Sequence, residues 1–169
     1  MTAVRVMISN GHDTDVYRDR AQDVLARAQH MFLYQMGTDP YVTEWDYRRD
    51  PSTVVPLGGV ATRSLAMVDY SEALLAILGP TVPRITSQEI CRACERRRDG
   101  DAVELWTFVN PAQTTARHER FFARVKREFG LEIVWSPYTN ELDFQATLFT
   151  TLFPYLSQRA GARYPGIGA

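Results

Sequence analysis

This sequence lacks the features that define several large classes of protein. It has only two cysteines among 169 residues, too few for a disulfide framework and in keeping with a reducing compartment. No apolar run approaches the length of a membrane-spanning helix, and no signal-peptide pattern precedes Val4. We therefore expect a cytoplasmic protein with no membrane partner.

The chain also lacks an excess of either charge. Its net charge is −1 and its arginines are mixed with aspartates and glutamates, so the overall balance does not favour a nucleic-acid partner. A content of 45% hydrophobic and 23% charged residues is typical of a globular domain with a sizeable core. We expect one domain over residues 1–160 and a flexible tail or linker over residues 161–169, where glycine is frequent.

Three common catalytic fingerprints are missing as well. The absence of Gly-x-Gly-x-x-Gly, Gly-x-x-x-x-Gly-Lys and Gly-x-Ser-x-Gly removes support for a Rossmann dehydrogenase, a P-loop NTPase and an α/β-hydrolase. Cys91 and Cys94 have the spacing of a redox pair, but the helix expected around them begins several residues earlier. Because no further ligands are suitably spaced, we expect no metal site.

The most informative stretch that is present runs from Ala73 to Leu78. Its six apolar residues show no polar alternation, which is typical of a strand buried on both faces of a parallel sheet. Gly79 and a following proline end the strand, and Thr86 is expected to open a helix with Glu89 in its first turn. This order predicts a carboxylate just beyond the carboxyl end of a central strand, where open α/β sheets bind their ligands.

Strand and helix patterns alternate along the whole chain. The expected strands cover residues 3–9, 41–45, 73–78, 102–109 and 131–135. The expected helices cover residues 15–36, 57–68, 86–100, 115–129 and 140–156. Right-handed crossovers would join them into a three-layer α/β/α sandwich around a five-stranded, parallel, doubly wound sheet of flavodoxin-like order 2-1-3-4-5.

In that strand order, the ligand crevice lies between the ends of the first and third strands. The residues expected to bind a ligand there are Ser9, Asn10, His12, Trp45, Asp46, Gly79 and Thr86, together with Glu89. The set combines one carboxylate on a helix, another on a loop, an aromatic ring and small residues that let a ligand approach the backbone. Such a set suits a nucleotide or nucleoside better than a peptide.

Several motifs carry a resemblance to a known family. The opening Val6-Met-Ile-Ser-Asn10, followed by Asp15-Val-Tyr-Arg-Asp-Arg20, resembles the start of the TIR-like domains of the DUF4062 type. The pair Asp69-Tyr70 before the apolar strand, its Leu78-Gly79 end and Ile85-Thr-Ser-Gln-Glu89 are similar to the core of that family. The resemblance covers roughly the first 110 residues.

The resemblance implies an activity, a substrate and partners. In enzymatic TIR domains and the related nucleoside deoxyribosyltransferases, a glutamate on the helix after the central strand attacks or stabilises the ribose carbon as a base leaves. The matching residue is Glu89. The implied protein is a TIR-like domain that binds and hydrolyses NAD or a related nucleotide at the N-glycosidic bond, as a bacterial defence or signalling effector. NAD is then a substrate and not a cofactor, and like subunits or other TIR-like domains are the implied partners.

Other interpretations stay open beside this one. A non-catalytic TIR-like module that binds a nucleotide or self-associates is the first alternative, and a nucleoside deoxyribosyltransferase-like enzyme is the second. The family pattern is interrupted at Asn10 and over the segment Pro80-Thr-Val-Pro-Arg84. Within the enzyme hypothesis, Ser9 and Asn10 would hold ribose or phosphate oxygens, Trp45 would stack on a ring, and Asp46 would orient the ribose hydroxyls.

Glu89 also has a purely structural interpretation. The sequence Thr86-Ser-Gln-Glu89 matches a capping box, in which the Thr86 hydroxyl accepts from the Glu89 amide and the Glu89 carboxylate accepts from the Thr86 amide. A glutamate that caps its own helix needs no further role. The catalytic hypothesis therefore requires a Glu89 side chain that is turned away from Thr86.

The remaining histidines and tryptophans divide into surface and core candidates. His12 falls in the expected crevice, whereas His30 and His118 are expected on helix surfaces. Trp106 and Trp135 lie within expected strands, so we place both in the core. The helix expected over residues 115–129 is heavily charged on one side and carries phenylalanines and a valine on the other.

Overall fold

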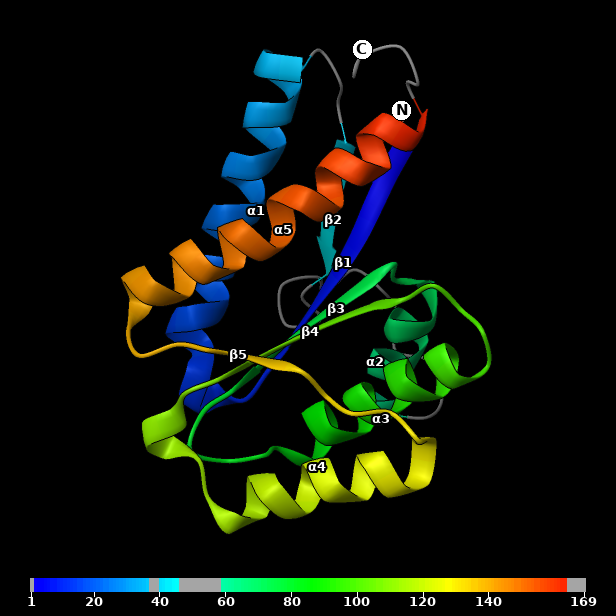
Figure 1. Ribbon diagram of the computed structural model, residues 1–169, viewed down its shortest axis with the longest axis vertical. Coiled ribbons are helices and arrows are strands. Elements are labelled where there is room, and N and C mark those ends of the chain that lie inside the picture. Colours follow the sequence, from blue (N-terminus) through cyan, green and yellow to red (C-terminus); the bar gives the residue numbers. More distant parts are fainter. Residues whose placement is uncertain (1, 37–39, 46–58, 164–169) are drawn as a thin grey trace.

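Strands and helices alternate along the chain in the computed structural model, which describes the backbone of residues 2–36, 40–45 and 59–163 and the side chains of residues 4–32 and 64–159 (Figure 1). The strands are β1 (Thr2–Asn10), β2 (Pro40–Trp45), β3 (Ala73–Leu78), β4 (Glu104–Val109) and β5 (Trp135–Pro137). The helices are α1 (Asp15–Met36), α2 (Gly59–Tyr70), α3 (Arg84–Arg98), α4 (Ala116–Phe129) and α5 (Glu141–Arg163), with short 3-10 turns η1 (His12–Thr14) and η2 (Pro111–Gln113).

The described strands pair in parallel in the order β2-β1-β3-β4-β5. β1 lies directly beside β3, with Val6 opposite Ala73 and Asn10 opposite Ile77. The chain reverses its direction of travel across the sheet at this pair, so β1 and β3 flank the topological switch point. A parallel α/β sheet flanked by helices, as expected from the sequence, is confirmed.

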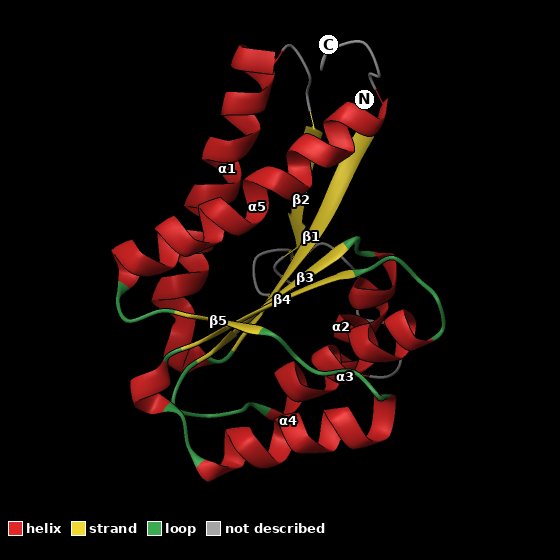
Figure 2. Ribbon diagram, viewed as in Figure 1, coloured by secondary structure: helices red, strands yellow, loops and turns green. Residues whose placement is uncertain are grey.

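Helices cover both faces of this sheet (Figure 2). α1 and α5 pack on one face, whereas α2, α3 and α4 pack on the other. All six residues of β3 are buried, and they alternate between the two layers. Leu75 and Ile77 face the α1 and α5 side, while Leu74 and Leu78 face the α3 and α4 side. β3 is apolar at every position because helices cover both of its faces.

Several boundaries differ from the sequence pattern. α2 begins at Gly59 and extends to Tyr70, two residues beyond its expected end. α5 continues through Pro154 to Arg163, so the first three residues of the expected tail are helical. Residues 164–169, the rest of that segment, lie outside the described part of the chain. The pattern placed the end of α5 too early because it assigned the glycine-containing segment from residue 161 to a tail, whereas the helix continues through Gly161.

The fifth strand also lies further along the chain than expected. The pattern predicts a strand over residues 131–135 with Trp135 in the core, but β5 begins at Trp135, whose exposed fraction is 36%. Ile133 is buried in the core although it precedes the strand, so apolar character did not mark strand residues here. Pro137 is tolerated because β5 is the edge strand of the described sheet and pairs with β4 alone. Its backbone therefore needs no amide hydrogen on the side away from β4. Trp106 is buried in β4, as expected.

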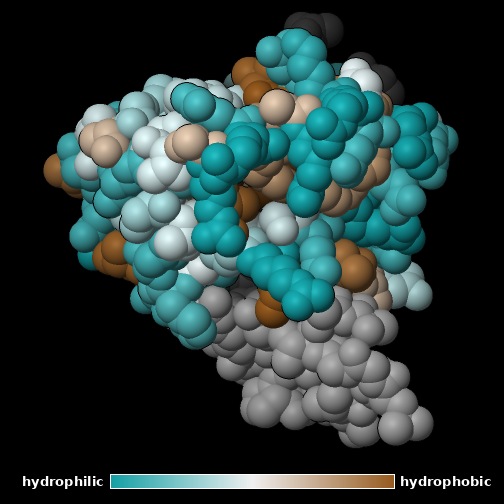
Figure 3. Space-filling view, turned by 90° about the horizontal axis from the view of Figure 1, so that it is seen from below, coloured by the Kyte–Doolittle hydropathy of each residue, from teal (hydrophilic) through white to brown (hydrophobic). Residues whose placement is uncertain are grey.

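Polar residues dominate the outer surface seen from below in Figure 3, with only scattered apolar ones between them. Within the described residues, every helix is too short or too polar to cross a membrane. Leu142 and Val134 are among the exposed large apolar residues.

α4 ends at Phe129, as its sequence predicts, and begins at Ala116, one residue after the expected start. Thr115 is the N-cap, and Gly130 follows the last turn with a φ of 67°, the left-handed conformation of a helix C′ residue. The Gly130 amide donates to the carbonyl of Lys126 at 3.0 Å. No heavy atom lies within 4 Å of the position that a Cβ would take, so only the backbone conformation requires glycine here.

Gly130→Ala is expected to lower the free energy of unfolding by about 1 kcal/mol, because alanine resists a positive φ. Gly130→Asn should cost less, since asparagine tolerates the left-handed region. Urea unfolding monitored by circular dichroism measures both values. An alanine variant as stable as the original chain would contradict this interpretation of Gly130.

Candidate functional site

A buried hydrogen bond joins the end of β1 to α3 at the switch point. The Ser9 hydroxyl donates to Oε2 of Glu89, and the two side chains are 2% and 1% exposed. Ser9 lies opposite Ala76 of β3 in the sheet register, which places the pair beside the central strand. The fold therefore brings together two of the expected site residues, which lie eighty residues apart in the sequence.

The capping-box interpretation of Glu89 is wrong. α3 begins at Arg84, two residues before the expected start, with Pro83 in extended conformation as the N-cap. The proline ring has no acceptor for a cap, and the Ser87 amide donates to the Pro83 carbonyl at 2.9 Å. Thr86 is thus the third residue of the helix, and Glu89 lies in its second turn. From there the carboxylate does not reach an orphan amide of the first turn, and it turns toward β1 instead.

The early start of α3 has a local cause. Proline has its φ fixed near the helical value and carries no amide hydrogen, so a helix can begin directly after Pro83 without losing a donor. Thr86 and Glu89 then lie three residues apart on one face of the helix. Both are 1% exposed, and this inner face packs toward the sheet.

The residues after β1 are tied to the start of α1. Asn10 donates from Nδ2 to the Gly11 carbonyl at 2.6 Å and to Oδ1 of Asp15 at 3.0 Å. The His12 side chain is 88% exposed, with its Nδ1 3.4 Å from Oδ2 of Asp15. Asn10 therefore orders the β1–α1 connection, while His12 faces solvent.

The two glycines at this edge of the sheet, Gly11 and Gly79, are required by the packing of neighbouring side chains. A Cβ on Gly79 would lie 2.7 Å from Cγ2 of Thr14, and one on Gly11 would lie 2.7 Å from Cγ of Pro83. The Thr81 hydroxyl also donates to Oδ2 of Asp13 at 2.8 Å. Glycine is thus required at position 79 because the β1–α1 connection fills the space that a side chain would take. The expected contact of Gly79 with a ligand stays a prediction.

His118 belongs to this end of the sheet, although the sequence pattern placed it on a helix surface. Its exposed fraction is 0%. Nδ1 accepts from the Thr115 amide at 3.2 Å, which completes a capping box, and Nε2 lies 2.9 Å from the Gly79 carbonyl. Since Nδ1 accepts, Nε2 carries the hydrogen and donates it to Gly79. The spacing Thr115-x-x-His118 at a helix start was the signal that could have revealed this role.

Tyr138 forms a similar buried hydrogen bond with the preceding backbone carbonyl, that of Leu78. Its hydroxyl donates to the Leu78 carbonyl at 3.0 Å, and its side chain is fully buried. Burial raises the pKa of Tyr138, with Tyr17 and Asp13 adding to the effect, so the phenol stays protonated as a donor. The last carbonyls of β3 are thus bonded by the protein's own side chains, and the polar pair beside them is Ser9 and Glu89.

Two expected ligand contacts cannot be placed. The backbone of Trp45 ends β2 opposite Met7, but its side chain lies outside the described residues. Asp46, with the polar segment that follows it to Thr53, lies outside them too. Both remain predictions.

The cysteine pair has the chemistry of inert thiols. Cys94 is buried, and its burial raises the thiol pKa to about 11, with Cys91 adding a smaller contribution. Burial also raises the pKa of Cys91, against the opposing effect of Arg124. Higher pKa values leave less thiolate at neutral pH, which disfavours redox catalysis. The described residues contain no group of histidine, cysteine and acidic side chains placed to hold a metal ion.

Comparisons with known proteins add little to this geometry. No family model matches the chain, and no curated protein matches it either. The Staphylococcus aureus homoserine dehydrogenase structure at pH 6.0 is similar over 81% of this chain, with 8% identity and a TM-score of 0.45. The chain spans 34% of that dehydrogenase.

A second solved structure is similar over most of both chains. It is the flavodoxin-like domain of a Synechococcus protein, with 16% identity, a TM-score of 0.46, and coverage of 90% of this chain and 99% of that one. Neither likeness is close enough to support an argument about function. The chemistry of the site therefore rests on the residues of this chain.

A double-mutant cycle tests the bond between Ser9 and Glu89. Ser9→Ala and Glu89→Gln should each destabilise the protein by about 1–3 kcal/mol, because each weakens a buried hydrogen bond to a charged group. Their combined effect should differ from the sum by about 1 kcal/mol or more, since the two residues are in contact. Urea unfolding gives the four free energies.

Ser87→Ala provides the matched control for this cycle. Ser87 lies on the same helix, but its hydroxyl donates to the Arg84 carbonyl, and residues two apart on a helix do not face each other. Ser87→Ala and Glu89→Gln should therefore be additive to within about 0.5 kcal/mol. A Ser9 cycle that is equally additive would rule out the buried pair.

His118→Ala is expected to lower the free energy of unfolding by about 2–4 kcal/mol. It removes a helix cap and leaves the Gly79 carbonyl without its donor. His30→Ala, at an exposed position of α1, should change stability by about 0.5 kcal/mol or less. Thermal unfolding compares the two variants, and equal melting temperatures would contradict the buried role of His118.

Proposed function

We propose that this chain is a TIR-like domain that binds NAD or a related nucleotide and hydrolyses its N-glycosidic bond, with Glu89 as the catalytic carboxylate. In this proposal the protein acts as a bacterial defence or signalling effector and works in assemblies of like domains. The observation that carries the proposal is the position of Glu89. Its carboxylate lies at the switch point of the sheet, held by Ser9 of the neighbouring strand.

The energetic cost of that position supports a role beyond folding. Taking a carboxylate out of water costs several kcal/mol, which its contacts in the fold must offset. The capping role that would explain Glu89 structurally is not available, because α3 begins at Arg84. A buried carboxylate at the place where open α/β sheets bind ligands is a candidate for catalysis.

The proposed reaction needs few catalytic groups besides Glu89. When the bond between the ribose carbon and the nicotinamide nitrogen breaks, the bonding electron pair leaves with nicotinamide. The ring is cationic in NAD and departs neutral, so it needs no general acid. The positive charge that develops on the ribose carbon is stabilised by the Glu89 carboxylate, and water then adds its oxygen and releases a proton. Ser9 serves as a positioning residue that holds Glu89.

The other expected ligand contacts differ in what supports them. His12 is exposed and is available to a phosphate or ribose oxygen. Asn10 is engaged with Asp15, so its part is to order the loop. Ring stacking by Trp45 and orientation of the ribose hydroxyls by Asp46 remain assigned by the family resemblance alone.

One observation favours a second candidate function. Glu89 is 1% exposed, so a sugar contacts its carboxylate only after the surrounding side chains have moved. A non-catalytic module that binds a nucleotide or assembles with like domains needs no such rearrangement. In that case the Ser9–Glu89 bond serves to fasten α3 to β1.

Incubation with NAD, followed by chromatography for nicotinamide, separates the two candidates. The wild-type chain at high protein concentration, where an assembly would form, is expected to release nicotinamide. Glu89→Gln should lower the rate by about a hundredfold or more, because the developing charge loses its partner. Glu95→Gln makes the same change at a half-exposed position of the same helix and should leave the rate unaltered.

Failure has two forms. An active Glu89→Gln variant would remove Glu89 from the mechanism. A wild-type chain that releases no nicotinamide at any protein concentration, yet binds NAD in equilibrium dialysis, would establish the non-catalytic module.

A further inference from the structure

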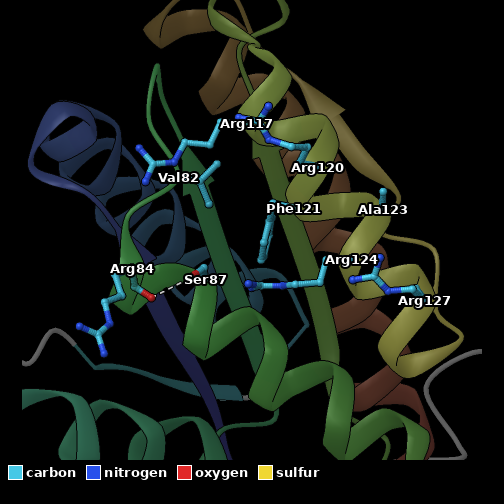
Figure 4. A pocket seen from close by; sticks show the side chains of 9 residues that line it. All are labelled: Val82, Arg84, Ser87, Arg117, Arg120, Phe121, Ala123, Arg124 and Arg127. Carbon is cyan, nitrogen blue, oxygen red and sulfur yellow. Dashed lines mark hydrogen bonds between the residues drawn. The ribbon is translucent and has the colours of Figure 1, made fainter.

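Positively charged side chains line a groove between α3 and α4. The groove has a volume of about 660 Å³ and lies beside the carboxyl end of β3 (Figure 4). Five arginines border it: Arg84 at the start of α3, and Arg117, Arg120, Arg124 and Arg127 on α4. In Figure 4, Arg117 and Arg124 extend from α4 toward α3 with the ring of Phe121 between them.

The α4 arginines form one stripe because of their spacing. Steps of three, four and three residues keep them on one side of the helix over about 15 Å. Val125 and Phe121 occupy the inner side, with exposed fractions of 0% and 6%. The amphipathic pattern of this helix therefore does two things. It covers the sheet on one side and presents guanidinium groups on the other.

These arginines differ in their partners from several other arginines of the protein. Arg20, Arg92 and Arg96 each have a carboxylate within 3 Å. Within the described residues, the following groove arginines form no ion pair: Arg84, Arg117, Arg120 and Arg127.

Arg124 is held only loosely by comparison. Its guanidinium donates to Sγ of Cys91 at 3.8 Å, and it lies 5.4 Å from the centre of the Phe121 ring and 4.0 Å from the Glu128 carboxylate. Gathering like charges along one groove costs electrostatic free energy that an anionic ligand would recover.

We propose that this groove binds the oligophosphate group of a small ligand. Guanidinium groups match phosphate oxygens with paired hydrogen bonds, and several of them along a concave surface suit adjacent phosphates. The groove volume falls within the usual range of small-molecule sites. Glu119 and Glu128 lie on the same helix, and the chain carries a net charge of −1, which disfavours a long polyanion such as nucleic acid.

This oligophosphate groove is distinct from the Ser9–Glu89 pair. Ser87 borders the groove, and Glu89 follows two residues later, about 200° around the helix. α3 therefore separates the two sites, with its outer face toward the arginines and its inner face toward β1. Binding in the groove does not depend on NAD hydrolysis, so the inference extends beyond the proposed function.

Titration calorimetry of the full chain with inorganic tripolyphosphate tests the groove. Binding is expected, and it should weaken as ionic strength rises because the contacts are exposed. Arg117→Gln, Arg120→Gln and Arg124→Gln should each weaken it by about tenfold or more, since each removes a charge-assisted hydrogen bond. Arg27→Gln, an exposed change on α1 across the sheet, is the matched control and should bind as the original chain does.

Two further ligands separate the sources of the phosphate group. ATP that binds as tightly as tripolyphosphate, or more tightly, supports the proposal, and in the second case the nucleoside adds contacts. AMP should bind at least about tenfold more weakly, because it offers a single phosphate. AMP binding equal to that of tripolyphosphate would overturn the requirement for adjacent phosphates.

Other outcomes overturn the proposal altogether. These are the absence of tripolyphosphate binding, binding that the groove variants leave unchanged, and tighter binding of a single-stranded oligonucleotide through the same arginines. Glu89→Gln is expected to retain full tripolyphosphate binding, because it lies on the other face of α3. Its binding and its NAD turnover are measured separately, so failure at one site is distinguishable from failure at the other.

Discussion

The burial of β3 on both faces is the constraint on which the rest of the structure depends. Six consecutive apolar residues must be covered from two sides, and this requires helices above and below the sheet. Parallel neighbours on both edges of β3 place β1 and β4 beside it with their carboxyl ends at the same edge. The polar chemistry of the protein is consequently concentrated where β3 ends.

At that edge, most polar groups are occupied by the chain. Tyr138 and His118 bond the carbonyls of Leu78 and Gly79, while Thr81 bonds Asp13 across the loops. These contacts fix the geometry of the crevice but leave few groups for a ligand among the described residues. The Ser9–Glu89 pair differs from these contacts because it buries a carboxylate. An apolar or neutral pair at the same place would cost less free energy to bury.

The two surfaces of α3 give the domain two separate kinds of chemistry. Its inner face carries a carboxylate suited to a developing positive charge, whereas its outer face borders a groove of guanidinium groups suited to negative charge. A single helix between the two sites keeps opposite charges apart. This arrangement follows from the start of α3 at Arg84, which determines the direction in which every later side chain of the helix points.

The alternation of strand and helix patterns was enough to determine the parallel α/β class, the limits of α1 and β3, and the end of α4. Those features follow from local periodicity and from residues such as Gly130, whose conformational preference acts within a few positions. Only the tertiary structure decided the roles of Glu89 and His118. Their partners, Ser9 and Gly79, lie 80 and 39 residues away, and no local pattern records which distant group a buried side chain will meet.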